Sequence, residues 1–118
     1  MAVFVYTRLF ADEQGESRFE EVSVELTDKG PIGHLSDSWN VREVIFRSND
    51  AGYDWNMHNA PDRQFIILLD GEIEITSSLG ESRIFKGGDV ILVEDIVGKG
   101  HKTRNIKKQI RKSILIKI

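Results

Sequence analysis

Short apolar runs separated by glycine turns constrain the fold of this chain more than any other feature of its sequence. Residues 20–26 (EEVSVEL) and 71–76 (GEIEIT) alternate polar and apolar side chains, the pattern of a strand with one face in solvent. Residues 3–6 (VFVY) and 65–69 (FIILL) are apolar at every position, which is typical of strands that are covered on both faces. Such strands need a second sheet or a partner subunit.

Nine strands are expected, and no long stretch has the period of a helix. They fall near residues 3–10, 18–26, 40–47, 63–69, 72–77, 82–85, 90–93, 100–106 and 110–118. Regular short strands between glycine turns predict an all-β sandwich or barrel. With 118 residues, the chain has enough length for one core, so a single domain over residues 1–118 is expected.

Two connections carry specific predictions. Asp70-Gly71 lies between two apolar runs and predicts a tight hairpin, because a type I′ turn requires positive φ at both of its central positions. Residues 26–39 form the longest stretch with loop composition. This stretch is expected to pack as a flap or to cross to a neighbouring subunit.

Composition excludes several classes of protein. The chain has no cysteine, so disulfides, thiolate metal sites and thiol nucleophiles are excluded. No apolar stretch approaches the length of a membrane span, and the first residues lack the basic and apolar regions of a secretory signal. A cytoplasmic protein without membrane contact is therefore expected.

Basic residues concentrate near the end of the chain. Residues 99–118 hold 8 of the 16 basic side chains and no acidic one. These charges interleave with isoleucines, as in a half-solvated strand, and no aromatic residue is present to stack on bases. Nucleic-acid binding is therefore not favoured.

Two spaced motifs contain a histidine each. The first begins at Gly52, continues through His58, Ala60 and Gln64, and ends at Gly71. The second is Gly98-Lys-Gly-His101-Lys-Thr-Arg-Asn105, preceded by a Gly-Gly-Asp turn at residues 87–89. A separation of 43 positions between the histidines means that only a closed fold could bring them together.

These two motifs resemble those of the cupin superfamily. Residues 15–20, 58–64 and 94–101 are more narrowly similar to a group of small, mostly uncharacterised bacterial cupins. The resemblance implies an all-β, single-domain cupin fold, a double-stranded β-helix or jelly-roll β-barrel, with a pocket at the barrel mouth. It also implies a homodimer, since cupins commonly pair their sheets and the strands that are apolar on both faces need covering.

The chain departs from the metal-binding pattern of the superfamily. Most metal-binding cupins have His-x-His followed by Glu, whereas this chain has His58, Ala60 and Gln64. His58, Gln64 and His101 form a candidate site for a weakly bound divalent metal such as Zn, Fe, Ni or Mn. The alternative is a pocket without metal, in which His58, Gln64 and His101 line the pocket as hydrogen-bonding, ligand-binding groups and the two histidines could act as a general acid and base.

Four further residues are candidate ligand contacts. Tyr53 and Trp55 precede His58, where aromatic side chains often contact a ligand. Arg63 and Arg104 are candidates for binding a substrate carboxylate.

The expected function is the binding of a small polar molecule in the barrel pocket. The alternative is a metal-dependent or metal-free enzyme of the dioxygenase, isomerase or lyase type that uses His58 and His101.

Overall fold

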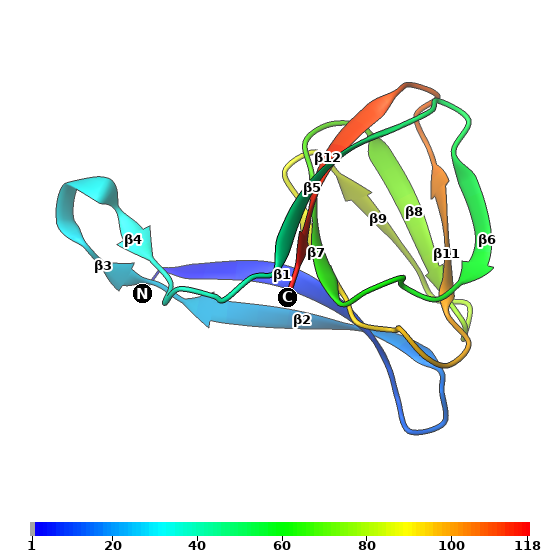
Figure 1. Ribbon diagram of the computed structural model, residues 1–118, viewed down its shortest axis with the longest axis horizontal. Coiled ribbons are helices and arrows are strands. Elements are labelled where there is room, and N and C mark those ends of the chain that lie inside the picture. Colours follow the sequence, from blue (N-terminus) through cyan, green and yellow to red (C-terminus); the bar gives the residue numbers. More distant parts are fainter. Residues whose placement is uncertain (1) are drawn as a thin grey trace.

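Two β-sheets face each other across an apolar core in the structure, a computed structural model that describes residues 2–118 (Figure 1). The larger sheet has the strand order β2-β1-β10-β7-β12-β5, and the smaller has the order β6-β11-β8-β9. The larger consists of β1 (Val3–Ala11), β2 (Ser17–Glu25), β5 (Glu43–Asn49), β7 (Gln64–Leu68), β10 (Val90–Val93) and β12 (Arg111–Lys117). The smaller consists of β6 (Asp54–His58), β8 (Glu72–Ser77), β9 (Ser82–Lys86) and β11 (His101–Asn105).

The sequence predicted most of these strands to within three residues at each end. The prediction missed β6, which carries His58, although residues 54–58 alternate polar and apolar side chains. It also started the strand near residue 40 too early, since β5 begins at Glu43.

The predicted hairpin at Asp70-Gly71 is wrong. β7 and β8 flank this turn but lie in different sheets, β7 between β10 and β12, and β8 between β11 and β9. Gly71 has a φ of 74°, whereas no residue other than glycine has positive φ within residues 2–118, so the turn is not of type I′. The connection is a corner between the sheets. Local turn chemistry identified the turn but not the partners of its strands.

The core lies between the inner faces of the two sheets. Leu9, Leu68 and Ile91 of the larger sheet pack against Ile73 and Ile75 of the smaller, and each is at most 2% exposed. Burying a side chain of this size contributes about 1.5–3 kcal/mol. These contacts hold the two sheets together.

The opposite face of the larger sheet, here called the outer face, is also apolar. Register places two rows of side chains across four strands there: Val90, Ile67, Ile114 and Phe46 in one, and Leu92, Phe65, Ile116 and Val44 in the other. β1 and β2 extend the face with Phe4, Tyr6, Val22 and Val24. The smaller sheet covers only the inner face of the larger sheet. Within residues 2–118, the outer face of the larger sheet therefore has no second sheet packed on it.

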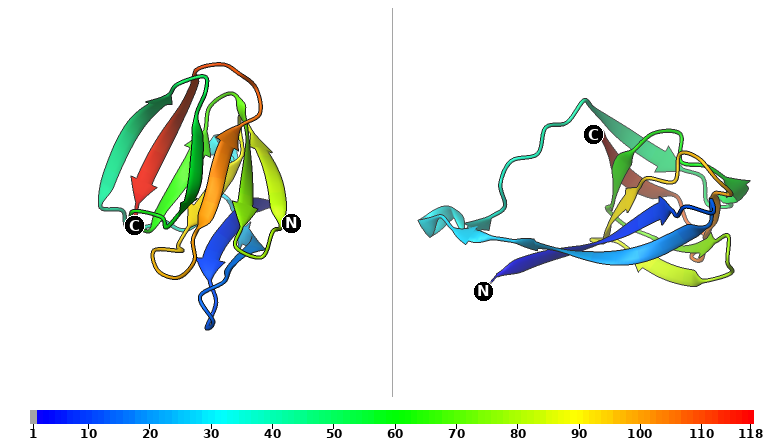
Figure 2. Two further views of the ribbon diagram at one scale, coloured as in Figure 1. Left: turned by 90° about the vertical axis from the view of Figure 1, so that its right-hand side faces the viewer. Right: turned by 90° about the horizontal axis from the view of Figure 1, so that it is seen from below.

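Residues 26–42 project from the barrel as an arm (Figures 1 and 2). The arm contains β3 (Thr27–Asp28), the 3-10 turn η1 (Gly30–Ile32) and β4 (His34–Leu35), which pairs only with β3. Most of its side chains are exposed, including Ile32 at 72%. Trp39, near the end of the arm, turns back onto the outer face.

Residues 2–118 contain no helix with the length and apolar character that crossing a membrane requires.

Gly100 allows β6 and β11 to approach each other, so its replacement is expected to be more damaging than a matched replacement of Gly80. Both glycines have positive φ, 75° and 87°, and an alanine at either position pays about 1–2 kcal/mol of backbone strain. A Cβ on Gly100 would also overlap the backbone carbonyl of His58, whereas a Cβ on Gly80 would meet nothing within 4 Å.

Urea denaturation should therefore show a loss of about 1–2 kcal/mol for Gly80→Ala and at least about twice that loss for Gly100→Ala. Equal losses would mean that the close approach of the two strands does not require glycine.

Candidate functional site

A cavity of about 90 Å³ lies between the two sheets and is lined by both histidines of the sequence motifs. Its walls are isoleucine, valine and leucine side chains, mixed with polar groups from both sheets. The polar and aromatic lining consists of Arg47, Tyr53, Trp55, His58, Gln64, His101, Thr103 and Arg111. No acidic side chain is among the residues that line it.

His58 and His101 face each other because β6 and β11 are neighbours. The two residues are directly paired in antiparallel register, and a bulge in the register follows between His101 and Thr103. Their ring centroids are 4.5 Å apart with the ring planes at 58°. The two segments, far apart in the sequence, thus meet side by side in the smaller sheet (Figure 1).

Asp95 fixes the orientation of His101. The Nδ1–H of His101 donates a hydrogen bond of 2.5 Å to Oδ2 of Asp95, and both residues are buried, at 4% and 0% exposure. A carboxylate acceptor on Nδ1 selects the tautomer in which Nε2 carries the lone pair. Nε2 is then the nitrogen available to a ligand.

His58 is held by its own strand and by Trp55. Its Nδ1 donates to the carbonyl of Asn56 at 2.7 Å, and the Trp55 ring stacks on the imidazole with centroids 3.4 Å apart. Burial lowers the pKa of His58 below its ordinary value, although the Asn56 carbonyl opposes this effect. His58 therefore favours the neutral state, again with Nε2 as the remaining nitrogen.

Ala60 and Gln64 line the same cavity as His58, but not as members of one strand. The chain leaves β6 after His58 and enters β7 only at Gln64, with Pro61 in the connecting loop. The loop and the start of β7, rather than strand alternation, bring Gln64 to the cavity, where it is 4% exposed.

The donors in this cavity do not fit a tightly held divalent metal. They are two imidazoles and the neutral amide of Gln64, and within residues 2–118 no group of three or more His, Cys, Asp or Glu side chains is arranged to hold an ion. The carboxylate of Asp95 is engaged by Nδ1 of His101. The guanidinium groups of Arg47 and Arg111 also line the cavity, and their positive charge disfavours the binding of a metal cation there.

Arg111, Arg47 and Thr103 are the polar lining residues that sequence reasoning missed. Arg111 is 1% exposed, donates through Nε to Oδ1 of Asn105 at 2.7 Å, and places its guanidinium 4.9 Å from the Tyr53 ring centroid. Burial, and next the charge of Arg47, lower the pKa of Arg111 to about 10, so it stays cationic at neutral pH. Arg47 donates through Nε to Ser113 Oγ at 3.0 Å, and burial lowers its pKa.

The interpretation of residues 110–118 as a strand with solvated charges holds for Lys112 but not for Arg111. Alternation along β12 directs Arg111, Ser113 and Leu115 inward, and Lys112 is exposed. The signal was present in the sequence, since Arg111 shares parity with Leu115. The inward direction of the Arg111 side chain follows only from the register of β12 with β5 and β7.

The other two predicted arginines lie outside the cavity. Arg63 forms an ion pair with Glu94 at the surface, and Arg104 forms one with Glu74 at 2.9 Å. Both side chains are about half exposed. Tyr53 and Trp55, by contrast, do line the cavity.

Comparison with known proteins gives similarity in structure only. No family model matches the sequence, and no curated protein matches it. Similar solved structures include protein NMB1881 from Neisseria meningitidis, with 16% identity over 71% of this chain and 88% of that one, at a TM-score of 0.43. A proposed ethanolamine utilization protein Q from Salmonella typhimurium has 16% identity over 99% and 97%, at 0.42. The Cnp3 cupin domain from Schizosaccharomyces pombe has 19% identity over 99% and 84%, at 0.44.

The strand topology itself agrees with the architecture expected from the sequence. Strands from both ends of the chain interleave in two facing sheets, and the two histidine segments become neighbouring strands at the cavity between those sheets. This is the arrangement that the sequence motifs predict. The chain therefore has an all-β fold of two facing sheets, with the histidine segments side by side at the cavity between them.

Proposed function

We propose that the protein binds a small polar molecule in the cavity between the sheets, without a tightly held metal, and that His58 and His101 contact it through Nε2. The observation that carries this proposal is the fixed orientation of both rings. Each Nδ1 is engaged by the protein, by Asn56 in one case and by Asp95 in the other. Each ring therefore offers its second nitrogen to a ligand.

The size and lining of the cavity support a small ligand. Sites for drug-sized ligands measure about 300–1,000 Å³, and this cavity is far smaller at about 90 Å³. Ile66, Ile75 and Val93 supply an apolar wall, while Gln64 and Thr103 add polar groups beside the histidines. A ligand of a few non-hydrogen atoms, or one such group of a larger molecule, matches this space.

Binding should be visible in the imidazole signals of the protein. We expect at least one of four small probes, acetate, acetamide, ethylamine and glycerol, to shift the ring resonances of His58 and His101 saturably in NMR titrations. His34, which lies exposed on the arm, serves as the internal control and should not move. If none of the probes moves either cavity histidine, the proposal fails.

The same samples test the metal. Elemental analysis should find well below one divalent metal per chain in the wild type and in a His58→Ala, His101→Ala double variant. One metal per chain in the wild type that disappears in the double variant would contradict a cavity without tightly held metal.

Acid–base catalysis on a small substrate is the second candidate, and Asp95 favours it. A buried carboxylate that accepts from Nδ1 of a histidine is the arrangement that orients an imidazole as a base. Within residues 2–118 Asp95 has no other side-chain partner: its Oδ1 is buried and forms no hydrogen bond. Facing His58, the His101 ring would complete a pair able to take up and return a proton.

Nitrogen-15 NMR of the imidazoles tests this role of Asp95. The proton of neutral His101 should be found on Nδ1 in the wild type, and Asp95→Asn should redistribute it between the two nitrogens while exposed Asp37→Asn does not. A proton on Nε2 of His101 in the wild type would exclude that nitrogen as the base.

A further inference from the structure

The cavity contains buried positive charge without a matching negative charge. Arg111 and Arg47 both line it, and within residues 2–118 neither forms an ion pair. All six other arginines of the chain form an ion pair with an acidic side chain. A buried guanidinium without a counter-charge is costly, so its presence in a cavity requires an explanation.

The hydrogen bonds of Arg111 leave part of its guanidinium free. Its Nε is taken by Asn105, but Nη1 is buried and has no partner. Its stem is in turn confined by the turn at Gly71, where a Cβ would collide with the Arg111 side chain. The group is held in place, and one of its donors is unused.

Arg47 lies beside Arg111 on the neighbouring strand. Arg111 pairs with Asn49 and Ser113 pairs with Arg47, so the two arginines are diagonal neighbours on the inner face of β5 and β12. Diagonal cross-strand positions are within reach of long side chains. Two guanidiniums at this spacing present several N–H donors to one small acceptor.

We infer that the ligand of this cavity carries an anionic oxygen group, a carboxylate or a phosphate, and that Arg111 and Arg47 bind it. This inference rests on the proposed function, because it names the chemical class of the molecule that the cavity takes. Arginine donors match the oxygens of both anions, and such charge-assisted hydrogen bonds are about twice as strong as neutral ones. The unused Nη1 of Arg111, the absence of acids in the lining and the small volume all agree with it.

Acetate and acetamide provide the test, because they have nearly the same shape and differ in charge. At constant ionic strength, the wild type should bind acetate at least about tenfold more tightly than acetamide in the NMR titration. Arg111→Gln and Arg47→Gln should each reduce this preference to within about threefold. Arg104→Gln, which removes an exposed guanidinium paired with Glu74, should leave it unchanged.

Inorganic phosphate, titrated in parallel, decides between the two anions by its affinity relative to acetate. Acetamide or glycerol binding as tightly as both anions would overturn the inference while leaving a small-molecule pocket intact. A purely structural Arg111 predicts a different result, in which Arg111→Gln lowers the melting temperature but keeps the acetate preference. If Arg111→Gln does not fold, Arg47→Gln decides, since Arg47 is only partly buried.

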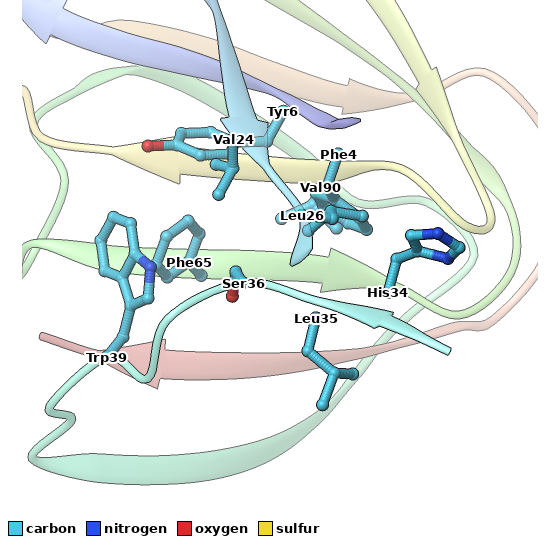
Figure 3. Close-up of a pocket in the computed structure, with 10 residues that line it drawn as sticks. All are labelled: Phe4, Tyr6, Val24, Leu26, His34, Leu35, Ser36, Trp39, Phe65 and Val90. Atoms are coloured by element: carbon cyan, nitrogen blue, oxygen red, sulfur yellow. The ribbon is translucent and has the colours of Figure 1, made fainter. Parts of the chain in front are cut away.

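A different observation concerns the outer face of the larger sheet, where aromatic side chains form the floor of an open groove. Tyr6, Trp39 and Phe65 pack edge to face, with ring centroids 5.2–6.5 Å apart. The groove beside them measures about 330 Å³, and Phe4 and Leu35 complete its walls (Figure 3). Phe4 and Leu35 remain 47% and 41% exposed there.

The same face also carries a projecting aromatic side chain. Phe46, on the edge strand β5, is 81% exposed, and Val44 beside it is 52% exposed. β5 and β1 are four strand steps apart, a distance of about 19 Å at the usual strand spacing. One surface therefore holds both a projection and a groove.

We propose that the homodimer expected from the sequence forms through this outer face, with Phe46 and the groove as its contact. A two-fold axis along the strands at the middle of the sheet lays β5 of one copy over the β1–β2 end of the other. Phe46 of each copy then meets the groove of the other, which is the reciprocal contact of an isologous dimer. The centre of the face carries no charge, while Arg8, Glu20 and Glu94 form ion pairs at its margin, as in an apolar interface with a polar rim.

The exposed apolar area supplies a large part of what such an interface needs. Specific interfaces bury about 800 Å² on each partner. Five exposed side chains at roughly 100 Å² each supply well over half of that: Phe4, Leu35, Trp39, Val44 and Phe46. The arm, which touches little of its own barrel, extends the contact.

Sedimentation equilibrium tests the dimer. The wild type should sediment at twice the chain mass of 13.4 kDa at tens of micromolar, and Phe46→Glu and Phe4→Glu should each sediment at the mass of one chain. Ile84→Glu is the matched control, because Ile84 is 59% exposed on β9 in the smaller sheet and should leave the dimer intact. Circular dichroism confirms that each variant is folded. A monomeric wild type, or a dimer that persists in Phe46→Glu, would overturn the proposal.

Discussion

The alternation of side chains in the six-stranded sheet is the constraint on which the rest of the structure depends. In β7 and β12 it sends Gln64, Arg111 and Leu115 inward, and sends Phe65 and Ile114 outward. A slip of one residue would exchange these sets, placing isoleucines in the cavity and a guanidinium on the outer face. The register of β12 between β5 and β7 therefore determines both the chemistry of the cavity and the apolar character of the opposite surface.

Charge distinguishes this cavity from a metal centre built on the same fold. A divalent cation needs carboxylates or several imidazoles, and the chain offers Ala60 and Gln64 at two of the expected ligand positions. In their place, β5 and β12 contribute two guanidiniums from the opposite sheet. The neutral residues at these two positions and the two guanidiniums are consistent with each other, because a cavity with buried positive charge favours an anion over a metal ion.

The sequence contained enough information for the strands and the histidines, but not for their surroundings. Glycine turns and alternation are local signals, and they located β7, β8 and β10 closely. The paired motifs correctly predicted that the two histidine segments meet. Asp95 and Arg111 were out of reach because their roles depend on partners on other elements. The turn at Asp70 shows the same limit, since its local residues do not specify that the flanking strands join different sheets.

The two tryptophans of the chain stand at two different places in this architecture. Trp55 stacks on His58 beside the cavity, and Trp39 packs on Phe65 in the groove of the outer face. Intrinsic fluorescence therefore has two sources that sense separate environments, one in contact with an imidazole and one within an aromatic cluster. Replacing either tryptophan by phenylalanine isolates the other emission, so the chain carries its own optical reporters for events in the cavity and on the sheet face.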